Sequence, residues 1–218
     1  PTRMFEVKDS TNANRIMNIR GTGTSGAFLA FLDANTTDDS KCRIGSIGGN
    51  SISMRGDAHY FQNGAGTTRM AIDSSGRVTK PFHPSFLARR STGGDGRGSA
   101  SPITEWSTST TAPCHNIGGH FNASTGKFTA PVAGMYHFSA CPGYKQTNYD
   151  FNIKFRIDNT DVFEPVRFID GGDDLTSHST ASGSITVYMT ANQTMSVCIA
   201  YTHHVNTTYN YFSGHLIG

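Results

Sequence analysis

The sequence predicts an all-β protein, and three observations lead to that class. Glycine occurs 24 times in 218 residues and charged residues make up only 16%, whereas helix surfaces normally use Glu, Lys, Arg and Ala. Residues 151–158 alternate strictly between apolar and polar side chains, which is typical of a half-buried strand. Tyr136, Phe138 and Ala140 also alternate after a turn at Gly134, so they would face one core together.

Composition excludes several function classes. A net charge of +2, scattered along the chain, is too slight to indicate nucleic-acid binding. No apolar run is long enough for membrane insertion, and the amino terminus lacks the features of a signal peptide. The four cysteines are far apart and form no CxxC pair, so we expect small buried apolar residues rather than zinc ligands or disulfides. They are Cys42, Cys114, Cys141 and Cys198.

Residues 1–80 consist of short apolar pieces separated by glycine-rich turns. The only dense apolar cluster lies within residues 27–32, which is too little to close a core within one chain. Residues 70–79, MAIDSSGRVT, resemble the strand-turn-strand element of phage tail-fibre proteins, in which three chains share one core. The resemblance implies a trimeric β-rich shaft or attachment segment.

Residues 81–84 are predicted to be a linker, because Pro81 and Pro84 force an extended backbone that cannot sit in a central strand. Residues 85–218 would then form an antiparallel head. The predicted strands of this head are 86–88, 135–140, 151–158, 162–168, 184–190, 194–201 and a final strand at the carboxyl end. Trp106 is either a packing anchor or a platform for a ligand.

Six residues of the head occur at a spacing that resembles a known family. They are Asn116, Phe121, Phe128, Gly134, Tyr136 and Phe138, and they match the signature of the complement C1q globular-head family, which is related in fold to tumour necrosis factor. Residues 182–189 and 212–217 are similar to the last strands of that family, whereas Thr110 and Ala140 replace its usual aromatics. The resemblance covers residues 85–218 and implies a trimeric jelly roll, a scaffold that carries many different recognition surfaces.

Three loops of the head are candidates for receptor binding: residues 143–149, 170–174 and 203–209. Tyrosine can stack on a sugar ring while its hydroxyl makes a hydrogen bond, which favours a glycan receptor. The alternative is that these tyrosines pack against neighbouring loops or between subunits. The candidate residues are Tyr144, Lys145, Asn148, Tyr149, His203, His204 and Tyr209.

The segment 170–174 carries three carboxylates, Asp170, Asp173 and Asp174, beside two glycines. Hard cations such as calcium prefer oxygen ligands of this kind, and some members of the resembled family bind calcium near the trimer apex. The spacing is not that of an EF-hand, so a solvated turn is the alternative. A histidine from each of three chains could also hold a metal on a threefold axis, with surface histidines as the alternative. No other cofactor is expected.

No catalytic motif occurs in the chain, so no enzymatic activity is expected. The predicted function is that of a virion structural protein, a phage tail fibre or tail tip, made in the host cytoplasm. It would be a homotrimer that contacts other tail proteins and binds a host surface glycan or protein through the head loops. The alternatives are a structural fibre without a receptor, a secreted C1q-like lectin and a capsule depolymerase.

Overall fold

The computed structural model confirms the all-β class, and the residues that it describes contain strands, turns and bends but no helix. These residues are 28–31, 42–46, 51–90, 101–104, 106–109, 113–144, 151–168, 179–180, 182–199 and 210–217. The chain divides into two compact units, Pro1–Lys80 and Pro81–Gly218, which we call the amino-terminal unit and the head. That residues 81–84 separate two independently folding parts stays a prediction.

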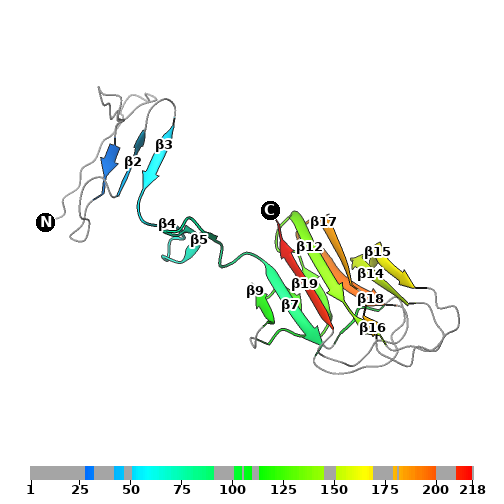
Figure 1. Ribbon diagram of the computed structural model, residues 1–218. Helices are drawn as coiled ribbons and strands as arrows, with labels where there is room; N and C mark the ends of the chain where they lie inside the picture. Colours follow the sequence, from blue (N-terminus) through cyan, green and yellow to red (C-terminus); the bar gives the residue numbers. More distant parts are fainter. Residues whose placement is uncertain are drawn as a thin grey trace. The chain divides into compact units, whose positions relative to one another are not determined.

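The amino-terminal unit contains two three-stranded antiparallel sheets (Figure 1). The first is formed by β1 (Phe28–Ala30), β2 (Arg43–Ser46) and β3 (Ile52–Arg55), and the second by β4 (His59–Gln62), β5 (Thr68–Ile72) and β6 (Val78–Thr79). Asp73 closes the turn between β5 and β6, because its Oδ1 accepts hydrogen bonds from the backbone N–H groups of Ser75 and Arg77, each at 2.9 Å. Gly76 has a φ of 80°, which favours glycine there.

The amino-terminal unit exposes its apolar side chains. Among its described residues, Ala71 is the buried apolar residue. The large apolar residues that remain exposed are Leu29, Phe31, Ile44, Ile52, Met54, Tyr60, Phe61 and Val78. A single copy of this unit therefore has no substantial core within the described residues.

The head is an antiparallel jelly roll built from two main sheets. The five-stranded sheet has the order β10 (Phe121–Asn122), β11 (Lys127–Thr129), β18 (Thr194–Ile199), β14 (Phe151–Ile157) and β15 (Thr160–Phe168). The six-stranded sheet has the order β17 (Gly183–Met189), β12 (Gly134–Cys141), β19 (Tyr211–Leu216), β7 (Ser85–Arg90) and β8 (Trp106–Ser107), and β9 (His115–Ile117) also pairs with β7.

Aromatic side chains from both sheets form the core of the head. The rings of Phe86 and Phe121 stack with centroids 4.3 Å apart, and the rings of Phe128 and Phe138 lie 5.4 Å apart. Tyr136, Phe138 and Ala140 are all fully buried, which confirms that they face one core. A side chain at Gly214 would collide with the rings of Phe138 and Phe86, so only glycine allows this close approach.

Two of the sequence predictions are corrected at the level of single residues. The strand predicted over 151–158 ends at Ile157, because Asp158 and Asn159 adopt φ values of 49° and 68° and form the turn. All four cysteines are free, but only Cys198 is buried, and the prediction of a buried residue is wrong for Cys42, which is exposed. Cys42 immediately precedes β2, in a sheet whose apolar residues Leu29, Ile44 and Met54 are also exposed.

Trp106 is a packing anchor. Its side chain is 5% exposed and its indole Nε1–H donates a hydrogen bond to the carbonyl oxygen of Ile103 at 2.7 Å. A buried indole with its one donor satisfied is not available to stack on a ligand. The adjacent Gly126 has a φ of 68°, and a side chain there would collide with Ile103.

Candidate functional site

The described strands bring the flanks of two of the candidate loops together. The strand β13 (Gly143–Tyr144) pairs with β16 (Ser179–Thr180), so the chain entering residues 145–150 lies next to the chain leaving residues 169–178. Phe151, which follows residues 145–150, is paired with Phe168, which precedes residues 169–178. The described residues that flank one segment are therefore paired with those that flank the other.

The third candidate loop begins and ends in the same neighbourhood. Residues 200–209 follow Ile199, which pairs with Ile153 near the start of β14. They precede β19, whose first residue Tyr211 pairs with Cys141. The described strand ends thus gather the flanks of all three candidate loops at one end of the head, which we call the loop end.

Of the candidate receptor residues, the backbone of Tyr144 is described. It is in β13, where Tyr144 pairs with Ser179, and not in a loop as expected. The other candidates lie outside the described residues: Lys145, Asn148, Tyr149, His203, His204 and Tyr209 for the receptor, and Asp170, Asp173 and Asp174 for calcium. Their roles stay predictions. Within the described ranges, no group of three or more His, Cys, Asp or Glu residues is arranged to hold a metal ion.

A surface that sequence reasoning missed lies on the outer side of the six-stranded sheet. Its residues alternate with the buried core residues along each strand. We call it the histidine face, and its described members are Ser85, Leu87, Arg89, Ser107, His115, Ile117, Met135, His137, Ser139, Cys141, Ser184, Thr186, Tyr188, Tyr211, Ser213 and His215. This set contains no Asp, Glu or Lys, and Arg89 is its one permanent charge.

Two histidines lie opposite each other on the histidine face. His137 of β12 and His215 of β19 are direct partners in the antiparallel ladder, and their ring centroids are 5.6 Å apart. The Nδ1 atom of His137 lies 3.0 Å from Oγ1 of Thr186 on β17. Burial lowers the pKa of His215, and the nearby imidazoles of His137 and His83 lower it further by charge repulsion. The ring of His83 contacts the carbonyl oxygen of Leu216 through its Nε2.

The outer side of the five-stranded sheet carries ion pairs instead, and we call it the ion-paired face. Lys154 Nζ lies 2.8 Å from Asp161 Oδ2 and 3.9 Å from Glu164 Oε2, and Arg156 Nε lies 2.8 Å from Asp161 Oδ1. The hydrogen bond from Lys154 holds the pKa of the Asp161 carboxyl below its usual value. Beneath this layer, burial raises the pKa of the Cys198 thiol, so a reactive thiolate is disfavoured.

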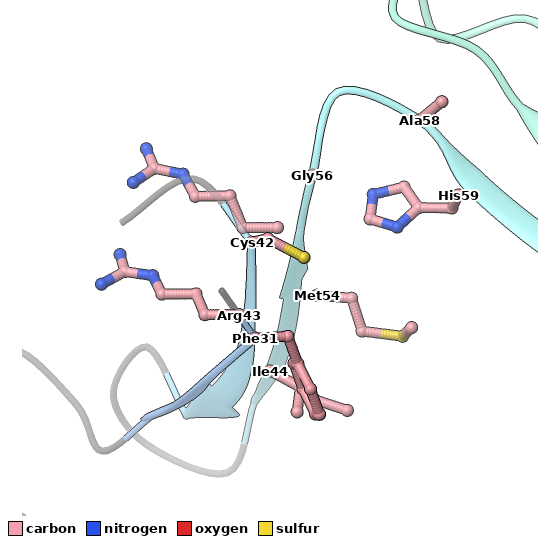
Figure 2. A pocket seen from close by; sticks show the side chains of 9 residues that line it. Phe31, Cys42, Arg43, Ile44, Met54, Gly56, Ala58 and His59 are labelled. Carbon is pink, nitrogen blue, oxygen red and sulfur yellow. The ribbon is translucent and has the colours of Figure 1, made fainter. Parts of the chain in front are cut away.

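A hollow of about 290 Å³ lies in the amino-terminal unit (Figure 2). Its apolar lining includes Phe31, Ile44 and Met54, and Cys42 and His59 also line it. The sequence singled out the apolar residues 27–32 but not the hollow, because Phe31, which follows β1, forms the wall together with residues of β2, β3 and the start of β4.

No helix among the described residues has the length and apolar character needed to cross a membrane.

The comparisons with known proteins concern the head. Among solved structures, the globular domain of a zebrafish complement 1qA protein is similar at 17% identity with a TM-score of 0.48, over 62% of this chain and 98% of that chain. The crystal structure of murine APRIL is similar at 7% identity with a TM-score of 0.46, over 62% of this chain and 99% of that chain. No curated protein sequence matches. The model of the C1q domain matches residues 98–217, more than half of the chain, so this chain belongs to the C1q domain family.

Proposed function

We propose that this chain is a structural protein of a phage virion, a tail fibre or tail tip, that forms a homotrimer and binds the host cell surface with the loop end of its head. The observation that carries this proposal is the contrast between the two units: the head has a complete aromatic core, whereas the amino-terminal unit leaves its apolar side chains exposed. This contrast is expected of a fibre in which several chains share the core of the shaft and each chain carries a recognition head with its own core.

The family supports the general part of this proposal. C1q domains are typically binding or structural domains rather than enzymes, and they commonly form trimers. The fold is a scaffold, so the receptor has to be sought in the loops and not in the sheets.

The amino-terminal unit supports association between copies. Ile52 is 80% exposed, Tyr60 is 64% exposed and Val78 is 57% exposed. Burying apolar surface stabilises a protein by roughly 25 cal/mol per Å², and small sheets without a covered apolar face are marginal in water. Packing against further copies of the same unit would bury these residues, and the hollow lined by Phe31, Ile44 and Met54 could accept side chains from a neighbouring copy.

In the head, we assign the contact between copies to the histidine face. Met135 and Tyr188 are paired neighbours there and are 38% and 58% exposed. Interface cores are depleted of charged residues, and the described part of this face has Arg89 as its one permanent charge. The ion-paired face, with Lys154, Arg156 and Asp161, would remain in solvent.

The receptor would then be bound at the loop end. Tyr144 and Tyr149 are the preferred contacts, because a tyrosine offers both a ring face and a hydroxyl to a sugar. Lys145, Asn148, Asp170 and the histidines of the segment 203–209 complete the candidate surface. Calcium at Asp170, Asp173 and Asp174 is part of the same proposal.

The test combines mass and adsorption. Light scattering coupled to size exclusion should give three chains for the full-length protein, and labelled protein should adsorb to cells of a susceptible bacterium. Tyr144→Ala and Tyr149→Ala should each lower adsorption and leave the trimer intact, whereas the control Thr129→Ala, at an exposed position of the five-stranded sheet, should adsorb as the parent does. A folded monomer at micromolar concentration would contradict the fibre, and a trimer that adsorbs to no cell would indicate a structural fibre without a receptor.

A further inference from the structure

We propose that His137 and His215 form a two-histidine site for a divalent transition-metal ion, Zn²⁺ or Cu²⁺, on the histidine face. The two residues are 78 positions apart in the chain, but they are direct partners across β12 and β19, and their side chains project from the same side of the sheet. Imidazole nitrogen is a preferred ligand of both ions.

The separation of the rings fits a shared ion. Zinc binds histidine nitrogen at about 2.0–2.1 Å, so two imidazoles on one tetrahedral ion have ring centres roughly 5.2–5.5 Å apart. The rings of His137 and His215 have centroids 5.6 Å apart and are inclined by 50°. The observed separation is therefore close to the value for a shared ion, and the antiparallel ladder holds the two backbones in register.

A neighbouring strand orients one of the two ligands. Thr186 pairs with His137 on the side of β12 away from β19, and its Oγ1 lies 3.0 Å from Nδ1 of His137. When Nδ1–H donates to this hydroxyl, the lone pair on Nε2 is free for a metal. Metal-binding histidines usually have such a hydrogen bond from the other ring nitrogen, which fixes the tautomer and the ring.

The surroundings favour a transition-metal ion over calcium or magnesium. The histidine face offers no described carboxylate that would favour calcium or magnesium, which take oxygen ligands. In one chain, the described residues supply two protein ligands, so water, or a group from another copy, would complete the coordination.

The experiment is a titration of the full-length chain with Zn²⁺, read by competition with a chromogenic chelator, and with Cu²⁺, read by electron paramagnetic resonance. The chain has nine histidines, so the site is identified by comparing the metal binding of each variant with that of the parent. His137→Ala combined with His215→Ala should remove one ion per chain and the copper signal of two bound nitrogens. Thr186→Val should weaken binding about tenfold, because it removes only the orienting hydroxyl.

His115→Ala is the matched control, because His115 is on the same face but pairs with Leu87 rather than with a histidine. It should bind the ion as the parent does. If the alanine pair does not fold, His137→Gln with His215→Gln provides the same test with polar side chains of similar length. Unchanged stoichiometry and affinity in a folded double variant would overturn the proposal. Because the readout is imidazole ligation, the result is independent of whether the chain adsorbs to cells, and light scattering on the same samples reports separately on the trimer.

Discussion

The histidine face and the ion-paired face cover the same core, but they carry different chemistry. The histidine face combines histidines, hydroxyls and exposed apolar side chains such as Met135 and Tyr188. On the ion-paired face, Lys154 and Arg156 both contact Asp161. The core needs only the inward residues of each strand, so the outward residues are free to differ between the two sheets.

The difference in charge between the two faces indicates which of them another copy of the chain can cover. Burying Lys154, Arg156 and Asp161 would cost the hydration of three charges, and their mutual attraction does not reliably compensate for that loss. Burying Met135 and Tyr188 would remove apolar surface from water, which is favourable. The histidine face is therefore the surface on which assembly can be built with the smaller desolvation cost.

The largest expected effect comes from the core that both faces share. Phe128 is fully buried and its ring meets those of Phe86, Tyr136 and Phe138. Phe128→Ala should lower the free energy of unfolding by about 3–5 kcal/mol, measured by urea denaturation. Val132→Ala, at a position that is 48% exposed, should change it by less than about 0.5 kcal/mol. Similar losses for both variants would mean that Phe128 is not central to the core.

A charge placed on each face would test the comparison directly. Met135→Asp introduces a carboxylate on the histidine face and should convert the assembled protein to smaller species, because an unpaired charge is costly in a buried interface. The matched control is Thr129→Asp, at an exposed position of the five-stranded sheet. It should leave the mass measured by light scattering unchanged. If the two variants behave alike, the histidine face is not the contact surface.

As the pH falls, protonation should reduce the contribution of the histidine face to stability at a higher pH than that of the ion-paired face. Because the pKa of His215 is lowered from its ordinary value of 6.5, the unfolded chain takes up a proton at a higher pH than the folded head does. The free energy of unfolding should therefore decrease as the pH falls through 6.5 towards the lowered value. Urea denaturation of the parent and of His215→Gln across this range measures the effect. An equal pH dependence in both proteins would exclude His215 as the cause.

The smallest effect is expected on the ion-paired face. The side chain of Asp161 is 46% exposed, so solvent screens its ion pairs. Lys154→Ala should lower the free energy of unfolding by no more than about 1 kcal/mol, and less at high salt. Asp161→Asn should have a comparably small effect in the same denaturation assay. A loss of several kcal/mol would show that this face contributes to stability as well as to solubility.

Much of the head could be predicted from short patterns. The alternation over 151–158 located β14 to within one residue, and the alternate aromatics at Tyr136 and Phe138 gave the inward side of β12. These predictions succeed because a strand has a period of two, so the residue types along it reveal which side is buried. The spacing from Asn116 to Phe138 also indicated the family that the matched domain confirms.

The candidate sites could be predicted less well. Tyr144 was expected in a loop but pairs with Ser179 in a two-stranded sheet, because the ladder between β12 and β17 is followed by a second pairing of the same two chain segments. Cys42 was expected to be buried, because cysteine is often a small core residue. It is exposed because the apolar side chains of the sheet that it adjoins, such as Leu29, Ile44 and Met54, do not form a buried core.

The sequence by itself determined the all-β class, the inward residues of the principal strands and the scarcity of apolar residues in the amino-terminal unit, because each follows from neighbours along the chain. Only the tertiary structure decided that His137 meets His215 and Thr186, and that the outer side of the six-stranded sheet carries so little charge. The physical reason is that strand pairing joins residues far apart in sequence, and the register that brings them together is set by the packing of the whole core.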